Sequence, residues 1–360
     1  MPTSNGVGEQ IERAGEQHAT DRRERYAHPV GMTQHTAATV RAPLTRIPLH
    51  LGPLPAVRPD RAPWPGSTIR SGGVTLHVRL TPGPGQPESA VYLHGLGGSA
   101  TNFTDLAGLV AGRMAGMALD LPGFGRSTPP PGFDYAPDSY AEVVAAFLTG
   151  RRSGPVHLVG NSMGGAVALL IAVRYPHLVR TLTLLAPAMP DLRVNPGRVS
   201  DPRVALALLP LVGDRMRRAL AGTSPQERTE RIMRLCFADP SVVSVVRRAA
   251  AEQELAEWAA LEWATAAMNE STGRLVRSWL ARGPRSWWRM AADVRAPALV
   301  VWGTADKVVS VRKAPRTAAV LPRGRLFVLP RTGHVPQIER PSSVARAVLG
   351  LVDAVNHYRW

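Results

Sequence analysis

Short apolar runs of strand length alternate with stretches of helical apolar spacing from residue 74 to residue 185, and again after residue 298. Such alternation is typical of β-α-β units, in which helices cover a mostly parallel sheet. The apolar pattern predicts strands at residues 74–80, 90–93, 117–120, 156–159, 182–185, 298–302 and 326–329. It predicts intervening helices at residues 103–114, 139–148, 163–175 and 341–355.

The alternation stops between residues 187 and 293, where apolar side chains recur at spacings of three and four. This spacing is typical of amphipathic helices, which are predicted at residues 204–211, 228–237, 241–255 and 275–280. The pattern therefore predicts one α/β core, residues 69–186 and 294–360, interrupted by a helical cap at residues 187–293.

Residues 1–68 lack any sustained apolar period. The first 40 of them are mostly polar and charged, and residues 41–68 are rich in Pro and Arg. Such a segment buries too little apolar surface to offset the entropy lost on ordering, so we expect a flexible basic arm. Met32 leaves a shorter natural start open.

The net charge of +16 raises the question of nucleic-acid binding. The excess positive charge is spread over the arm, the core and the cap, and only Lys307 and Lys313 are lysines. Because no basic cluster or zinc-finger spacing accompanies this charge, we expect no nucleic-acid partner, although acidic partners or anionic substrates would be attracted. The chain has no secretory signal pattern and no apolar run long enough to span a bilayer, which favours a cytoplasmic protein without stable membrane insertion. The oligomeric state is left open.

The strongest local motif is G-N-S-M-G-G at residues 160–165, between a predicted strand and a predicted helix. Glycines at this spacing allow a sharp strand-to-helix turn that presents a serine hydroxyl, and the next backbone N–H can bind an oxyanion. Ser162 is therefore the candidate nucleophile. The alternative is a glycine-rich turn with an idle serine.

Serine needs a base to take its proton and a third group to orient that base. His334, in T-G-H-V-P after the last predicted strand, is the candidate base, and Asp306, beyond the preceding strand, is the candidate acid. Asp191 is the fallback for the acid, and Asp306 in an ordinary turn is the structural alternative. The single cysteine, Cys236, excludes an internal disulfide and a cysteine metal cluster, and the chemistry calls for no metal and no organic cofactor.

A second oxyanion donor is expected from the loop H-G-L-G-G-S at residues 94–99. Its glycines let backbone N–H groups approach a substrate oxygen, and we expect the N–H groups of Leu96 and Met163 to form the donor pair. The loop lacks the Lys-Ser/Thr ending of a phosphate-binding P-loop and the spacing of a dinucleotide fingerprint.

These motifs, together with D-L-P-G-F-G-R-S at residues 120–127, resemble the α/β-hydrolase superfamily over about residues 74–355. The resemblance implies a mostly parallel eight-stranded sheet with the cap between strands six and seven. It also implies a serine nucleophile, since epoxide and haloalkane hydrolases of the superfamily carry aspartate at this position. The elbow is similar to that of carbon–carbon bond hydrolases of ring-cleavage products, whereas the loop at residues 95–98 lacks the proline usual in them.

Five of the eight tryptophans fall in the cap, where they form either its core or the wall of an apolar substrate pocket. The candidate pocket residues are His94, Gly95, Phe124, Trp258, Trp263 and Trp287. We expect hydrolysis of a small-molecule carboxylic ester with an apolar acyl or aromatic group through an acyl-enzyme. The alternatives are a carbon–carbon bond hydrolase, an amide or lactone hydrolase, a cofactor-free perhydrolase and a non-catalytic ligand-binding protein.

Overall fold

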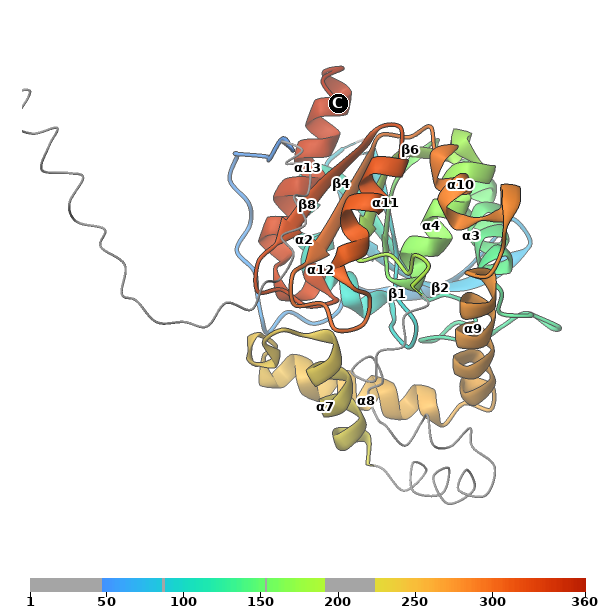
Figure 1. Ribbon diagram of the computed structural model, residues 1–360. Coiled ribbons are helices and arrows are strands. Elements are labelled where there is room, and N and C mark those ends of the chain that lie inside the picture. The colour runs from blue at the N-terminus through green and yellow to red at the C-terminus, as the bar shows by residue number, and fades with distance from the viewer. Residues whose placement is uncertain (1–46, 86–87, 153, 192–223) are drawn as a thin grey trace, which may run out of the picture. The chain divides into compact units, whose positions relative to one another are not determined.

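The computed structural model describes residues 47–85, 88–152, 154–191 and 224–360. Within these ranges eight strands form one sheet in the order β1-β2-β4-β3-β5-β6-β7-β8 (Figure 1). The strands are β1 (Gly66–Ser71), β2 (Val74–Thr81), β3 (Glu88–Leu93), β4 (Met114–Leu119), β5 (Val156–Asn161), β6 (Val179–Leu185), β7 (Ala298–Gly303) and β8 (Gly324–Leu329). Strands β3 to β8 run parallel, while β2 is antiparallel to both β1 and β4.

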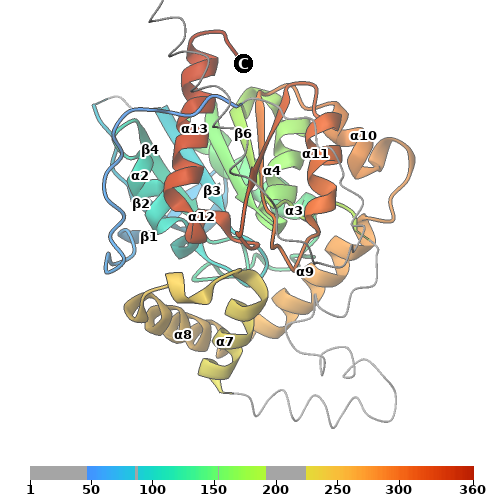
Figure 2. The same ribbon diagram turned by 60° about the vertical axis from the view of Figure 1, so that its left-hand side comes forward.

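Helices cover both faces of this sheet (Figure 2). Those of the core are α2 (Thr104–Val110), α3 (Pro137–Arg151), α4 (Met163–Arg174), α11 (Ala314–Val320), α12 (Pro336–Glu339) and α13 (Pro341–Asn356). Between β6 and β7 lie α7 (Pro225–Cys236), α8 (Val245–Ala259), α9 (Ala264–Ser278) and α10 (Trp287–Ala292). Short 3-10 helices, among them η1 (Ala100–Phe103), connect some of these elements. In the described part of the chain, no helix has both the length and the apolar character needed to cross a bilayer.

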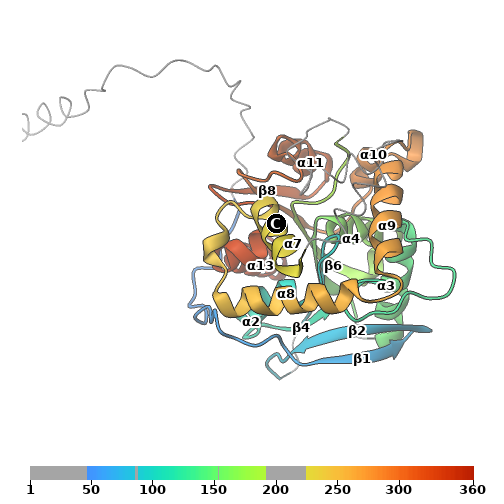
Figure 3. The same cartoon turned by 90° about the horizontal axis from the view of Figure 1, so that it is seen from below.

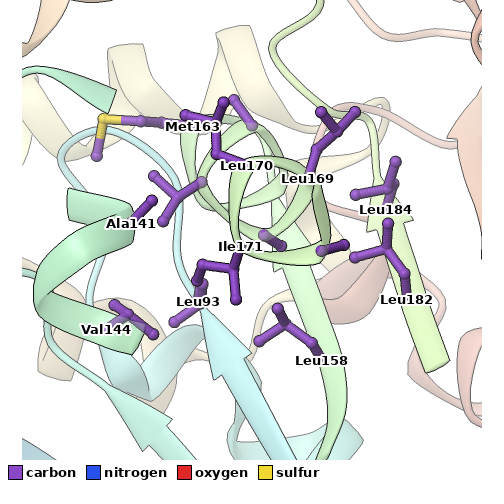
Figure 4. Packing of buried hydrophobic residues seen from close by; sticks show 14 of the residues in the cluster. Leu93, Ala141, Val144, Leu158, Met163, Leu169, Leu170, Ile171, Leu182 and Leu184 are labelled. Carbon is purple, nitrogen blue, oxygen red and sulfur yellow. The ribbon is translucent and has the colours of Figure 1, made fainter. Parts of the chain in front are cut away.

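Strand β3 shows why the central strands are apolar throughout. Val91 and Leu93 pack on the face covered by α3 and α4, and Ala90 and Tyr92 pack on the opposite face with α2 and α13. A parallel sheet buried on both faces has no solvent side that calls for polar residues. Figure 4 shows the first of these faces, where side chains of α4 fit between those of the strands and α3.

The predicted strands all lie within observed strands except at the boundary of β4, which begins at Met114 instead of residue 117 and ends at Leu119, one residue before the predicted end. The predicted helix at residues 103–114 is shorter, because η1 precedes it and Met114 already belongs to β4. Strand β1 was not predicted, since its G-S-T-I-R-S sequence lies at an exposed sheet edge and carries little apolar character. The predicted helix at residues 204–211 lies outside the described residues.

The prediction of a flexible arm over residues 1–68 is wrong for residues 47–68. Residues 66–68 belong to β1, and residues 47–65 lie along the core without regular secondary structure. Trp64 donates from Nε1 to the carbonyl of Thr104 (2.9 Å), and His50 pairs through Nδ1 with Asp353 (2.8 Å). This segment is held by contacts with residues 40 and 303 positions away. The prediction of a flexible arm used only the composition of the segment itself, so it could not include these contacts.

Helices α7 and α8 lie over the edge of the sheet where the parallel strands end, as the view from below shows (Figure 3). We call α7, α8 and α9 the cap helices. Helix α10 also falls in the predicted insertion, but its buried Trp287 and Ala291 pack into the core cluster on the α3–α4 face.

Candidate active site

The candidate chemical residues follow the carboxyl ends of three parallel strands, β5, β7 and β8. Ser162 directly follows β5, while Asp306 and His334 lie three and five residues after the ends of β7 and β8. The loop after β3 emerges beside β5, because Leu93 and Gly160 are paired in register. Ligand sites of open α/β sheets lie at this edge, and the fold therefore gathers four distant segments there.

Ser162 has a strained backbone, with φ 53° and ψ −117°, which few non-glycine residues adopt. Two glycines make this turn sterically accessible. A Cβ at Gly160 would lie 2.2 Å from the carbonyl oxygen of Gly164, and one at Gly164 would lie 2.2 Å from that of Leu93. The turn thus presents a half-buried serine at the N-terminus of α4, where the helix dipole favours developing negative charge.

Asp306 and His334 are hydrogen-bonded through Oδ2 and Nδ1 at 2.9 Å. The other carboxylate oxygen, Oδ1, accepts the backbone N–H groups of Val308 (2.8 Å) and Val309 (2.9 Å), which fixes the carboxylate. The Asp306 side chain is fully buried. A carboxylate held in this way keeps the proton of a neutral imidazole on Nδ1 and leaves Nε2 as the acceptor.

Asn161 connects the serine strand to the histidine loop. Its Nδ2 donates to the carbonyl oxygens of Leu185 and His334, each at 3.0 Å. The hydrogen bond between the Ser162 hydroxyl and Nε2 of His334 is not made in this structure, and among the described residues neither the hydroxyl nor Nε2 has another partner, while Nδ1 stays bonded to Asp306. Such bonds are often long without substrate and tighten in the complex.

The glycine-rich loop after β3 lies against the serine. A Cβ at Gly95 would lie 3.0 Å from the Cβ of Ser162. In the described part of the chain, no group accepts a hydrogen bond from the backbone N–H of Leu96 or of Met163. The described part of the chain therefore does not use these two donors, which the sequence predicted as a pair.

His94 is buried behind the glycine-rich loop, where it holds the backbone of Gly95 and Leu121, and it does not line the pocket for which it was a candidate. Its side chain is fully buried; Nε2 accepts the N–H of Leu121 (2.9 Å), and Nδ1 therefore carries the proton that is donated to the carbonyl of Gly95 (2.7 Å). Burial lowers the pKa of the imidazole, against a smaller opposing effect of Asp120. The ring is thus held neutral in the folded protein.

This burial predicts a pH-dependent contribution to stability. The folded pKa of His94 lies below its ordinary value of 6.5, so below that pH the unfolded chain binds a proton that the folded chain does not. Stability is lost as the pH falls below 6.5. We expect His94→Gln, which keeps a donor and an acceptor, to reduce the slope of unfolding free energy against pH by up to about 1.4 kcal/mol per pH unit. Urea unfolding between pH 5 and 8 measures the slope, and exposed His177→Gln is the control that should leave it unchanged.

Asp120 is a second support of the loop that sequence reasoning missed. Its carboxylate accepts the N–H groups of Ala100 (2.7 Å) and Arg126 (2.9 Å) and pairs with His77 Nδ1 (2.8 Å). Burial raises the pKa of this carboxyl, but the hydrogen bonds, above all the one with His77, outweigh burial, and the pKa lies below its ordinary value. Its position in D-L-P-G-F-G was visible in the sequence, but its partners were not.

Gly303 lets the acid strand approach the histidine loop closely. A Cβ at this position would lie 2.1 Å from the carbonyl oxygen of Thr332 and 2.4 Å from that of Gly333. We expect Gly303→Ala to lower the free energy of unfolding by about 3 kcal/mol, because backbone atoms must shift. Gly273→Ala is the matched control: nothing lies within 4 Å of that Cβ on α9, and it should stabilise by roughly 0.5–1 kcal/mol. Thermal unfolding that ranks the two variants equally would contradict this steric argument.

Of the aromatic candidate pocket residues, Phe124 and Trp258 stack on each other where the core meets α8, Trp263 precedes α9, and Trp287 is packed in the core. Phe124 is buried under Trp258, with ring centroids 5.8 Å apart and nearly parallel planes, and Trp258 donates from Nε1 to Gly123 (2.8 Å). Trp263 is the N-cap residue of α9, and its Nε1 is buried without a partner in the described residues. Trp287 does not face a pocket: it is 2% exposed and donates from Nε1 to Ser278 on α9.

The fallback acid Asp191 makes no hydrogen bond or ion pair with His334 that the structure shows. Its side chain is buried and pairs with Lys313 at 3.5 Å, whereas Asp306 is the carboxylate bonded to His334. Within the described ranges, no group of three or more His, Cys, Asp or Glu side chains is arranged to hold a metal ion.

A cavity of about 690 Å³ separates α7 and α8 from the core. Its wall includes Gly97 and Gly98 of the glycine-rich loop and apolar side chains of the cap such as Met233, Phe237 and Trp258. Ser162 and His334 do not line it. The cavity therefore adjoins the glycine-rich loop without including the candidate nucleophile and base in its wall.

The family model described as "alpha/beta hydrolase fold" matches residues 91–341, well over half of the chain. The chain belongs to the α/β-hydrolase superfamily. This α/β-hydrolase has the eight-stranded, mostly parallel sheet and the flanking helices that the resemblance of its motifs implied.

Known relatives of this α/β-hydrolase include hydrolases of more than one kind. A 2-hydroxy-6-oxononadienedioate/2-hydroxy-6-oxononatrienedioate hydrolase of Cupriavidus pinatubonensis is 26% identical over 78% of this chain and 92% of its own length. Lipase 3 of a Moraxella species is 24% identical over 77% of this chain and 81% of its own. The solved structure of a 2-hydroxy-6-oxo-6-phenylhexa-2,4-dienoate hydrolase from Rhodococcus has a TM-score of 0.64 at 22% identity, covering 81% of this chain and 100% of that one. That last likeness concerns the fold alone.

Proposed function

We propose that this α/β-hydrolase is a serine hydrolase that cleaves a carboxylic ester through an acyl-enzyme. The observation that carries the proposal is the Asp306–His334 hydrogen bond, because its histidine loop is tied through Asn161 to the strained elbow that presents Ser162. Nucleophile, base and orienting acid are then all supplied by segments that follow the carboxyl ends of β5, β8 and β7 at one edge of the sheet.

In the proposed reaction, Ser162 Oγ attacks the ester carbonyl while His334 Nε2 takes its proton. The N–H groups of Leu96 and Met163 bind the oxyanion of the tetrahedral intermediate. His334 then gives the proton to the leaving alcohol, and an acyl group remains on Ser162. Water, deprotonated by His334, attacks this acyl-enzyme and releases the acid, while Asp306 stabilises the imidazolium at each stage.

The cavity beside the loop supports an apolar substrate. Ligand pockets of 300–1,000 Å³ with mainly apolar walls are typical of small-molecule sites, and this one measures about 690 Å³. Gly97 and Gly98 of its wall belong to the loop that carries the proposed oxyanion donor Leu96. The lipase among the relatives supports the same substrate class.

Carbon–carbon bond cleavage is the second candidate, favoured by the relatives that hydrolyse 2-hydroxy-6-oxo dienoates. The same serine, base and oxyanion donors would serve that reaction. A substrate panel separates the two candidates. It contains 4-nitrophenyl esters of graded acyl length and a 2-hydroxy-6-oxo dienoate, whose cleavage is monitored as a loss of its absorbance.

The test of the proposed function combines this panel with burst kinetics. We expect a burst of one 4-nitrophenolate per chain, followed by slower turnover, and labelling of Ser162 by a fluorophosphonate. Turnover of the dienoate alone would establish the second candidate. A folded protein that is neither labelled nor active on any substrate, yet binds a ligand, would be a binding protein and would refute the proposal.

A further inference from the structure

We propose that Glu339 is a positioning residue that fastens the His334 loop to the C-terminal end of cap helix α7. This inference rests on the proposed role of His334 as the base. It assigns the cap a second task besides covering the site, namely holding the base loop in place.

Glu339 lies at the end of α12, is 4% exposed, and uses both carboxylate oxygens as acceptors of backbone N–H groups. Oε2 accepts from Gly333 at 2.8 Å, directly before the candidate base. The same oxygen accepts from Ala238 at 3.2 Å, and Oε1 accepts from Asp239 at 3.3 Å. One buried carboxylate therefore joins the core loop to the segment that follows α7.

The end of α7 contacts the acid and base loops independently of this carboxylate. The N–H of His334 donates to the carbonyl of Cys236 at 2.6 Å, and Lys307, next to Asp306, donates from Nζ to the carbonyl of Arg234 at 2.8 Å. The approach is close enough that a Cβ at Gly333 would lie 2.3 Å from the Cys236 oxygen. Carbonyl groups in the last turn of a helix have no partner within the helix. Here the base loop supplies a donor to the carbonyl of Cys236, and the acid loop supplies one to the carbonyl of Arg234.

The backbone around His334 is consequently held from two sides. Asn161 of the core holds its carbonyl, while Cys236 of the cap accepts its N–H and Glu339 accepts the N–H of the preceding Gly333. Without the carboxylate, buried N–H groups of both segments lose their acceptor, a strongly unfavourable arrangement that the chain relieves by moving. The geometry thus points to a coupled displacement of the base loop and the α7–α8 connection.

The test measures kcat per fluorophosphonate-titrated site for wild type, Glu339→Gln and Glu339→Ala, using an acetate ester whose acyl group is too short to occupy the cavity. We expect kcat per titrated site to fall about 100-fold in Glu339→Ala, because a shift of about 1 Å in a reacting group costs this much, with KM changed less than about threefold. Glu339→Gln keeps one acceptor oxygen, so its kcat per titrated site should be roughly tenfold higher than that of Glu339→Ala.

Amide hydrogen exchange supplies the readout of coupling. Glu339→Gln should accelerate exchange at Gly333 and His334 in the core and, to a similar degree, at Ala238 and Asp239 beside the cap. Glu142→Gln, which removes an exposed carboxylate on α3 (64% side-chain exposure), is the matched control and should change neither kcat nor exchange.

A purely structural role predicts that Glu339→Ala and Glu339→Gln lower the melting temperature but leave kcat per titrated site unchanged. That result would overturn the inference. If Glu339→Ala does not fold, Glu339→Gln alone decides between the two roles. A wild-type protein that is neither titrated by fluorophosphonate nor active would instead refute the proposed function, so the two failures are distinguishable.

Discussion

Replacement of Ser162 by alanine should lower kcat for a 4-nitrophenyl ester by roughly 10⁶-fold, to the small residual rate that oxyanion binding alone provides. Without the hydroxyl no acyl-enzyme forms, and His334 has no serine proton to accept. The same loss is expected for His334→Ala. Because the two groups act as one unit, the double variant should be no slower than either single variant. Initial rates and fluorophosphonate labelling measure both effects.

The control for this prediction is Ser67→Ala, which removes an exposed hydroxyl from the edge strand β1 and should leave kcat and labelling unchanged. The strained backbone at Ser162 is set by its glycine neighbours, so Ser162→Ala should fold and bind ligand. Retention of more than about 1% of wild-type kcat by well-folded Ser162→Ala would exclude the proposed nucleophile, given the size of the expected loss.

Replacement of Asp306 by asparagine should lower kcat by about 10⁴-fold with little change in the fold. The amide oxygen would take over the two bonds from the N–H groups of Val308 and Val309, which now end on Oδ1. The amide NH₂ group would then face Nδ1 of His334, where the carboxylate oxygen now accepts a hydrogen bond. A donor there forces the proton of the imidazole onto Nε2, which can no longer accept a proton from Ser162.

This tautomer argument has a measurable signature. Nitrogen-15 NMR of the His334 ring should show the proton on Nδ1 in the wild type and on Nε2 in Asp306→Asn. Exposed Asp138→Asn on α3 is the matched control, with unchanged kcat. Equal rates for Asp306→Asn and the wild type would show that the hydrogen bond to His334 serves the fold and not the reaction.

The elements of the core were predictable because their causes are local. A strand buried on both faces is apolar throughout, and a serine turn this tight calls for glycine at residues 160 and 164. Chain order suggested Asp306 as the partner of His334, and the structure places their side chains 2.9 Å apart. Their catalytic roles, and the division into core and cap, stay predictions.

Other features depended on partners far away in the chain. The segment at residues 47–65 is ordered by contacts with the core, although its composition is that of a flexible arm. Trp287 was counted with the cap because it lies in the helical insertion, but α10 turns it into the core. Glu339 carried no signal of its own, and Asp120 stood in a visible motif without any sign of its partners, since a carboxylate that binds backbone N–H groups resembles an exposed one in sequence.

The sequence by itself determined the alternation of strands and helices, the serine elbow and the order of the candidate groups, because each follows from side-chain periodicity or from the steric demands of a short turn. Only the tertiary structure decided which backbone groups hold these residues. Asn161, Asp120 and Glu339 act on segments between 6 and 173 positions away, and hydrogen bonds of that kind exist only after the parallel strands bring their carboxyl ends to one edge. The physical reason is that periodicity is a property of neighbours in sequence, whereas hydrogen-bond satisfaction is a property of neighbours in space.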